Sequence, residues 1–455
     1  MVAHLFNPFP TRGTIPTRFA QALFDFRRLN HRMHNKLFIA DGALAVTGGR
    51  NLSDEYFMRS AESNFFDYDV LMAGPVISQA ASLFDAYWNA PEVRTAASVL
   101  HPTEQAEDLR RIFDARVDGA DTPDPLPFRG RDRLGHAPVG DELTAGRVRM
   151  AYGTAQAFAD SPAKASGLLE TERLPSGALL DSSRGLLTAL FDTAQSEILL
   201  SSPYLIPGAE GLKGARASVQ RGVRISVLTN SLAATDEPVV HTGYRRYRDK
   251  MLRAGMELFE LHPRLGQQLL LPGEASNTLL RLHTKAALVD RERVFIGSVN
   301  FDPRSQALNT EFGLFVNSPE LAGEMLGLFE LLKHKASYQV LLKAGTERDL
   351  EWVWADARGG VDARGAGHRH RNRLSRRRNH HQGRAEYPWL DDCSVGLVVK
   401  CHRYSGRRWF LRCRNLAFGT FTCLHDVGTS SREVASGTRW HRRRRSLQAR
   451  CGAAR

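Results

Sequence analysis

The sequence predicts an α/β protein with two tandem α-β-α sandwich halves related by a pseudo-twofold axis, the first half incomplete, and a disordered Arg-rich C-terminal tail. Three observations support this prediction. A chemically specific motif occurs twice, helix and strand patterns alternate before its second copy, and the composition changes abruptly near residue 355. The 455 residues, 42% of them hydrophobic, suffice for two domains of ordinary size.

The repeated motif has a fixed offset. Shifting the chain by 249 residues superposes HNKLFIADGALAVTGGRN (34–51) on HTKAALVDRERVFIGSVN (283–300). His, Lys, Asp, the first Gly and the final Asn coincide, which indicates an internal duplication. Each copy has the pattern of a strand, a tight turn and a second strand. In the second copy we expect strands at 283–289 and 294–297, joined by a charged turn.

An α/β rhythm surrounds the second motif. The apolar periodicity predicts, in chain order, a helix at 183–195, a strand at 198–201, a helix and a strand around 211–229, an amphipathic helix at 241–254 and a strand at 256–261. A strand at 311–316 and a helix near 321–335 follow the motif, and regular patterning fades around residue 354. Residues 186–354 therefore form the second half.

The first half, residues 1–90, is shorter. Only 33 residues precede His34, beginning with the strand-like AHLFNPF, so this half lacks about 70 residues that the second half possesses. We expect that the chain starts late relative to a complete repeat. Residues 91–185 read as a connector between the halves, with a helix near 104–116 and a polar, Pro- and Gly-rich stretch at 118–146.

The tail, residues 355–455, differs from the rest in charge. It holds 23 of the 62 Lys and Arg residues but 7 of the 49 acidic residues, so residues 1–354 carry a net charge of −3 and the tail +16. All five cysteines lie in it without a CxxC pair, which argues against a zinc site. We expect a disordered or frame-shifted extension. Its Arg runs leave open non-specific anion or nucleic-acid binding, which the basic pI does not extend to the body.

Membrane insertion is not predicted. No stretch of the sequence approaches the roughly 18–20 consecutive apolar residues of a membrane span. The N-terminus also lacks the charged start and apolar core of a signal peptide. Any membrane association is therefore expected to be peripheral.

The two motifs carry the chemistry. Residues i and i+2 of a strand share a face, so His34 projects with Lys36 and His283 projects with Lys285. A pseudo-twofold axis would gather two imidazoles and two ammonium groups in one pocket. Asn51 and Asn300, at the ends of the second strands, add amide donors. This set suits a phosphodiester, with one imidazole to attack phosphorus and one to protonate the leaving alcohol. It requires neither a metal nor a cofactor.

At these residues the chain resembles the phospholipase D superfamily, whose signature is HxKxxxxD followed by a GG or GS pair and Asn; the resemblance covers roughly residues 1–354. It implies that His34, Lys36, Asp41, His283, Lys285 and Asp290 are catalytic. One histidine would form a phosphohistidine, with His34 preferred as nucleophile and His283 as acid, although the reverse stays open. Asp41 and Asp290 taken singly also suit hairpin turns.

The resemblance also implies orienting residues. Family members orient each histidine through an acidic residue downstream of a motif. Glu311 in NTEFGLFV matches this position after the second motif. Asp67 in FFDYDVLMAGP is its counterpart after the first, with spacing that differs by five residues. Ser298 belongs to the run GSVNFDPRS, which is similar to the family's second-motif extension.

Several segments further resemble bacterial cardiolipin synthases of the class C type: NHRMHNKLFIADG, GGRNLSDEYF, DSPAKA (160–165), SSPYLIPG (201–208) and the stretch 229–261. The resemblance implies transfer of a phosphatidyl group between phospholipids, phosphatidylglycerol and a second phospholipid, by a bacterial enzyme peripheral to the membrane on its cytoplasmic side. Tyr244, Tyr247, Met251 and Leu252 would line an acyl groove or, alternatively, belong to the core. A phospholipase D, a nuclease-type phosphodiesterase and an inactive fragment with an anion-binding tail remain alternatives.

Overall fold

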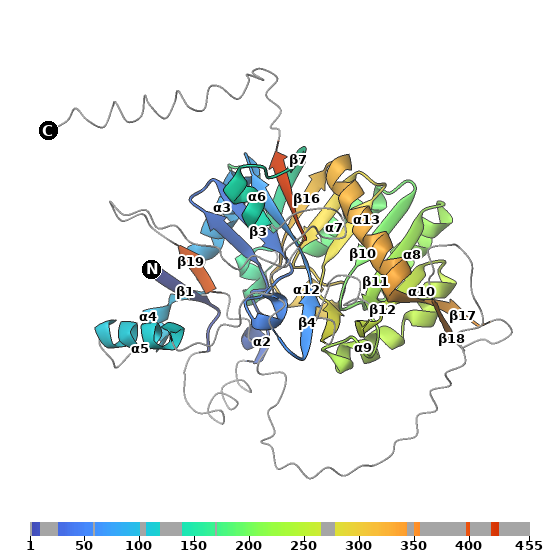
Figure 1. The fold of residues 1–455 in the computed structure, drawn as a ribbon, viewed down its shortest axis with the longest axis horizontal. Coiled ribbons are helices and arrows are strands. Elements are labelled where there is room, and N and C mark those ends of the chain that lie inside the picture. The colour runs from blue at the N-terminus through green and yellow to red at the C-terminus, as the bar shows by residue number, and fades with distance from the viewer. Residues whose placement is uncertain are drawn as a thin grey trace, which may run out of the picture.

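The fold is an α/β sandwich around one large sheet, as the sequence predicts. The computed structural model describes residues 2–9, 26–57, 60–100, 106–118, 139–168, 171–264, 278–343, 350–354, 397–400 and 420–426. Fifteen strands of these residues join in a single mixed sheet. Figure 1 shows helices lying on both faces of it.

The second half follows the predicted alternation closely. Its strands are β10 (Glu197–Ser201), β11 (Arg224–Asn230), β12 (Glu257–Leu261), β14 (Ala286–Val289), β15 (Arg293–Gly297), β16 (Phe312–Asn317), β17 (Ser337–Leu342) and β18 (Leu350–Trp354). Its helices are α7 (Ser183–Asp192), α8 (Gly208–Gln220), α9 (Pro238–Arg245), α10 (Arg248–Arg253), α12 (Pro303–Ala307) and α13 (Pro319–Ala336). Strands β10, β11 and β12 are parallel, as their helical crossovers require.

The first half repeats the hairpin in the same register. It contains β2 (Leu37–Ala40), β3 (Leu44–Gly48), β4 (Ser63–Phe66), β5 (Tyr68–Ala73), α3 (Val76–Trp88) and the short 3₁₀ helix η1 (Asp54–Phe57). Leu37 pairs with Thr47 in β2–β3, and Ala286 pairs with Ile296 in β14–β15. Each residue of the second pair lies 249 residues after its counterpart in the first pair, so the duplication seen in the sequence is also present in the structure.

The two halves meet through β7 (Met150–Ala159) and β20 (Thr420–Asp426). The main strand order is β18-β17-β12-β11-β10-β14-β15-β16-β7-β20-β5-β3-β2, with β9 (Leu179–Leu180) branching from β7 and β8 (Glu172–Arg173) from β9. The stretch expected as a connector thus supplies a central strand of the sheet.

Two short strands lie within the part of the tail that the structure describes. Strand β20 runs parallel to both β5 and β7, and β19 (Leu397–Lys400) pairs with β1 (Val2–Phe6). Both segments are short runs rich in β-branched, aromatic and aliphatic residues, LVVK and TFTCLHD, and such residues favour strands. The remaining tail residues lie outside the described ones.

Two hydrophobic layers flank the sheet because successive strand residues point to opposite faces. On β10, Leu199 packs in the layer beneath α3 and α13, whereas Ile198 and Leu200 pack in the layer beneath α7, α8, α9 and α10. Helix α13 begins at a Ser318 side chain that accepts the backbone N–H of Leu321, a standard N-cap. The active-site hairpins lie between these two layers.

The remaining elements lie at the periphery or between the halves. They are β6 (Val93–Thr95), β13 (Leu279–Leu282), α2 (Phe26–Leu29), α4 (Ala96–Leu100), α5 (Ala106–Asp118), α6 (Val139–Ala145) and the 3₁₀ helix η2 (Pro162–Ser166). Strand β13 pairs in parallel with β4 and so links the halves next to the second motif. None of the helices in the described part of the chain is long and apolar enough to cross a bilayer.

Candidate active site

The backbone of each motif histidine is hydrogen-bonded to the other half, at a residue in or just before one of its strands. The backbone N–H of His34 donates to the carbonyl of Thr310 at 2.9 Å, and that of His283 donates to the carbonyl of Phe66 at 2.8 Å. The next residues along those strands are the acidic ones, Glu311 and Asp67. The backbone pairing therefore delivers each carboxylate to the histidine of the opposite half.

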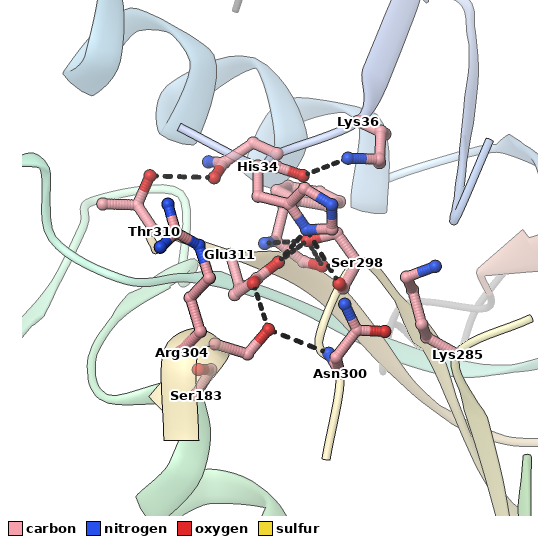
Figure 2. Close-up of polar contacts among 12 residues, drawn as sticks. His34, Lys36, Ser183, Lys285, Ser298, Asn300, Arg304, Thr310 and Glu311 are labelled. Atoms are coloured by element: carbon pink, nitrogen blue, oxygen red, sulfur yellow. Dashed lines mark hydrogen bonds and ion pairs between the residues drawn. The ribbon is translucent and has the colours of Figure 1, made fainter. Parts of the chain in front are cut away.

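The first pair is His34 with Glu311. Nδ1 of His34 lies 2.8 Å from Oε2 of Glu311 and 3.1 Å from the carbonyl oxygen of Ser298 (Figure 2). Burial alone would raise the pKa of Glu311, but His34 and the hydroxyls of Ser298 and Ser305 outweigh it and lower the pKa. An ionised Glu311 accepts the Nδ1 proton, which leaves the lone pair of His34 on Nε2.

The second pair is His283 with Asp67, joined by 2.7 Å between Nδ1 and Oδ2. Burial raises the pKa of Asp67 to about 6 against the opposing charges of Lys285 and Arg50. Gly49 makes room for this carboxylate, because a Cβ there would lie 2.5 Å from Oδ1 of Asp67. The glycine of the GG pair is thus a steric requirement of the site.

Each motif lysine contacts the backbone of the histidine two residues before it. Lys36 Nζ donates to the carbonyl of His34 at 2.9 Å, and Lys285 Nζ donates to that of His283 at 2.6 Å. Burial lowers the pKa of His34 although Glu311 opposes this shift. The pKa of His283 falls well below 6.5 because of burial and the positive charges of Lys285 and Lys36. Both rings are therefore neutral in the empty site near neutral pH.

The two asparagines do not play equivalent parts. Asn51 donates through Nδ2 to the hydroxyl of Tyr56 at 3.0 Å, and that hydroxyl lies 3.2 Å from Nε2 of His283. Asn300 instead uses its backbone N–H, which donates to the Ser305 hydroxyl at 3.1 Å. Its buried Oδ1 has no hydrogen-bond partner among the described residues.

The motif aspartates lie in the hairpin turns and not between the histidines. Asp41 and Asp290 share a left-handed backbone conformation, with φ of 51° and 53°. The carboxylate of Asp290 accepts the backbone N–H groups of Gln195, Ser196 and Glu197 at 2.8 to 3.1 Å. These contacts tie the turn to the start of β10. Against the opposing effect of burial, these amides lower the pKa of Asp290 to about 2.

A buried network missed by the sequence analysis supports Glu311. Asp160 accepts the backbone N–H of Glu311 at 2.9 Å and forms an ion pair with Lys164 at 3.0 Å. Lys164 also donates to the carbonyl of Ser305, whose hydroxyl donates to Glu311 at 2.6 Å. The DSPAKA segment was the signal in the sequence that could have revealed this network. Its Asp and Lys are four residues apart and both are buried, and a buried ion pair requires further hydrogen-bond partners.

The first half has a comparable support in Arg50, also missed. Its Nε donates to Asp69 at 2.5 Å, and its Nη2 donates to the backbone carbonyl of Asp67 at 3.4 Å. Nη1 of Arg50 also donates to the backbone carbonyl of Tyr56. Arg50 follows the GG pair directly, so its position in GGRN was the available signal.

The acyl-groove hypothesis does not fit the residues proposed for it. The predicted helix 241–254 is divided into α9 and α10, and Tyr244 and Met251 are buried in the hydrophobic layer beneath them. The hydroxyl of Tyr244 donates to buried Glu260 at 3.0 Å. Tyr247 and Leu252 pack against the same layer. The structure therefore assigns this face to the core.

Comparison with known proteins agrees with the geometry. A family profile described as cardiolipin synthase, PLD-like domain, matches residues 187–333. Cardiolipin synthase C of Escherichia coli is 36% identical over 340 residues, 74% of this chain and 69% of the relative. An uncharacterized protein of Helicobacter pylori is 30% identical over 70% of this chain and 60% of its own length.

Among solved structures, phosphatidylserine synthase of Haemophilus influenzae matches with a TM-score of 0.44 and 14% identity over 71% of this chain and 66% of its own. Two histidines held crosswise by carboxylates on a duplicated α/β scaffold define the class, and the chain belongs to the phospholipase D superfamily. Within that superfamily it is cardiolipin synthase-like.

Proposed function

We propose that the protein transfers a phosphatidyl group between phospholipids through a phosphohistidine on His34, and so makes cardiolipin. The observation that carries this proposal is the difference between the two Nε2 atoms. Among the described residues, Nε2 of His34 has no hydrogen-bond partner, whereas Nε2 of His283 lies 3.1 Å from Nζ of Lys285 and 3.2 Å from the Tyr56 hydroxyl. A free lone pair suits a nucleophile, and a hydrogen-bonded nitrogen suits proton transfer.

In the first step, Nε2 of His34 attacks the phosphorus of the donor lipid. The P–O bond to the leaving alcohol breaks, and that oxygen takes a proton from Nε2 of His283. Glu311 holds the imidazolium-like ring that forms on His34, while Lys36 and Lys285 neutralise the non-bridging oxygens. In the second step, a lipid hydroxyl gives its proton to His283 and attacks phosphorus, and the P–N bond to His34 breaks.

The depressed pKa of His283 is compatible with its acid role. Lys36 and Lys285 contribute to that depression in the empty site. A bound phosphodiester carries a negative charge next to both lysines and offsets their effect, so substrate binding raises the pKa of His283. Substrate binding therefore favours the charged, proton-donating form of His283.

Phosphatidylglycerol and a second phospholipid are the substrates that we propose, reached by peripheral association with a bacterial membrane at its cytoplasmic side. Two exposed aliphatic side chains near the site support a lipid surface as the partner. Leu52, 89% exposed, follows Asn51, and Leu232, 58% exposed, lies two residues after Asn230. Asn230 bonds both backbone groups of Leu282, directly before His283, at 2.8 Å.

The proposal is tested with phosphatidylglycerol vesicles and rapid acid-free quenching. We expect wild type to form cardiolipin and a base-stable, acid-labile phosphoprotein, and His34→Ala to form neither. His283→Ala should lose about 10²- to 10⁴-fold with phosphatidylglycerol but recover on a phosphatidyl ester with a nitrophenolate leaving group, which needs no acid. A phosphoprotein that persists in His34→Ala would contradict the assignment, and phosphatidic acid as the sole product would favour a phospholipase.

A further inference from the structure

The nitrogen of His283 that we propose for proton transfer is contacted by a tyrosine hydroxyl as well as by Lys285, whose Nζ lies 3.1 Å from Nε2. The Tyr56 hydroxyl lies 3.2 Å from Nε2, the ring atom opposite the one that Asp67 holds. Asn51 Nδ2 donates to the same hydroxyl at 3.0 Å, so the phenol oxygen accepts from Asn51 and its proton points to Nε2. His283 is thus bracketed by two groups of the first half.

The position of this hydroxyl is fixed from several sides. Tyr56 is 7% exposed, stacks on Phe65 with ring centroids 4.6 Å apart, and meets the His283 ring edge-on at 4.9 Å. Its backbone N–H donates to the carbonyl of Ser53 at 3.1 Å, and Arg50 contacts its carbonyl. A side chain held in this way reaches Nε2 as part of the site and not through a chance rotamer.

The repeat shows that this contact belongs to one half only. The 249-residue offset that superposes the motifs places Tyr56 on Ser305. The Ser305 hydroxyl donates to Glu311 at 2.6 Å, and among the residues that the structure describes it contacts no histidine nitrogen. At this duplicated position, the second half therefore has a serine that bonds a carboxylate, and the first half has a tyrosine that contacts a histidine nitrogen.

We propose that Tyr56 is a further catalytic residue, which occupies on His283 the place of the alcohol hydroxyl and keeps water from it. The proposal rests on the proposed function. In the phosphohistidine state the Tyr56 hydroxyl holds Nε2 until an alcohol displaces it. The alcohol then gives its proton to Nε2 and its oxygen forms the new P–O bond. The P–N bond breaks, and its electron pair returns to His34. By occupying Nε2 until the alcohol arrives, the phenol disfavours water as acceptor.

The test is the partition of the intermediate between transfer and hydrolysis. Tyr56→Phe keeps the packed ring and removes the hydroxyl. In vesicles of phosphatidylglycerol, we expect the ratio of cardiolipin to phosphatidic acid to fall about tenfold, the effect of one hydrogen bond. Tyr244→Phe removes an equally buried hydroxyl, bonded to Glu260, and should leave the ratio unchanged. Equal loss of both products in Tyr56→Phe, or an unchanged ratio, would overturn the proposal.

A second measurement separates this proposal from the proposed function. In protein carrying ¹⁵N-histidine, we expect the Nε2 resonance of His283, assigned by its absence in His283→Ala, to shift downfield in Tyr56→Phe because it loses a donor. An unchanged resonance would show that Tyr56 does not hold Nε2. The absence of any cardiolipin from wild type would instead refute the transferase function while the resonance shift remained.

Discussion

The two halves carry the same hairpin in the same register, yet the motif aspartates have different surroundings. Asp290 accepts backbone N–H groups at the start of β10, the strand next to its hairpin. Asp41 has the same backbone conformation, but β2 is the last strand of the described sheet and the Asp41 side chain is exposed. In the second half, this motif residue therefore joins the hairpin to its neighbouring strand.

The two buried carboxylates both contact a histidine, but their surroundings differ and shift their pKa values in opposite directions. Glu311 has hydroxyl donors from Ser298 and Ser305 and a lowered pKa. Asp67 is one methylene shorter, fits against Gly49, and has a raised pKa. The second half thus provides His34 with an ionised carboxylate. The first half provides His283 with a carboxyl group whose pKa is about 6.

The largest expected effect comes from the carboxylates. Glu311→Gln should lower the transfer rate about 100-fold or more, because His34, the proposed nucleophile, loses the negative charge that fixes its tautomer. Asp67→Asn should lower it less and should also change the pH profile. The pKa of Asp67, raised to about 6, means that below pH 6 the carboxyl group is mostly protonated and no longer places a negative charge on the N–H at Nδ1 of His283. Wild-type activity should therefore fall as pH drops through 6.

The pH–rate profile of transfer checks this difference between the carboxylates. The limb near pH 6 should disappear in Asp67→Asn and persist in Glu311→Gln. If both variants keep it, the titrating group is not Asp67, and the contrast between the two pairs is weaker than the structure indicates.

A smaller effect is expected at the glycine that admits Asp67. Gly49→Ala places a Cβ 2.5 Å from Oδ1 of Asp67, so the carboxylate must move. We expect about a tenfold loss of rate and about 1 to 3 kcal/mol of lost stability from overpacking. Gly214→Ala on α8, where a Cβ meets nothing within 4 Å, is the matched control; it should leave the rate unchanged and should not lower stability, because Ala favours a helix interior over Gly. Thermal unfolding and transfer rates should be measured on both variants. A Gly49→Ala variant with unchanged rate and stability would contradict the steric role of this glycine.

The smallest effect on rate, with a clear effect on stability, is expected at the motif aspartates. The pKa of Asp290 is lowered to about 2 from 3.8, which corresponds to about 2 kcal/mol of stability above pH 4. This contribution is lost as pH falls through about 2, because the carboxyl group is then neutral in the folded and unfolded states.

Urea unfolding at pH 7 should therefore find Asp290→Asn less stable than wild type and Asp41→Asn nearly unchanged. The difference should shrink as the pH is lowered from 4. Equal destabilisation by the two substitutions would remove the distinction between the hairpins, and a transfer rate abolished in Asp290→Asn alone would return this residue to the reaction.

The sequence predicted the features that depend on local pattern. The duplicated hairpins and the alternation from 183 to 261 follow from short-range periodicity and a repeat, whereas Asp67 and Glu311 were implied by the resemblance to the superfamily. The sequence did not predict the helix break between α9 and α10, because neither Gly nor Pro marks it. There, Arg248 forms a buried ion pair with Glu260 at 2.8 Å, a contact between distant residues.

The sequence also did not reveal which carboxylate reaches which histidine. Spacing along the chain places Glu311 after the second motif, while the parallel pairing of β4 with β13 and the bridge from Met33 to Thr310 direct the contacts across the halves. Tyr56 was visible in GGRNLSDEYF without a role, since its function depends on the packing of η1 against Phe65. Such long-range docking leaves no periodic signal.

The crossed pairing has a consequence for how such a protein changes over generations. Each histidine depends on a carboxylate inherited with the other copy of the duplicated segment, so neither copy can decay while the other persists. The copies are nevertheless released from resembling each other, because Gly49 with Asp67 has only to suit His283, and Ser298 with Glu311 only to suit His34. Substitutions in this lineage should therefore covary between the halves, within each crossed set, and not between positions that the repeat superposes.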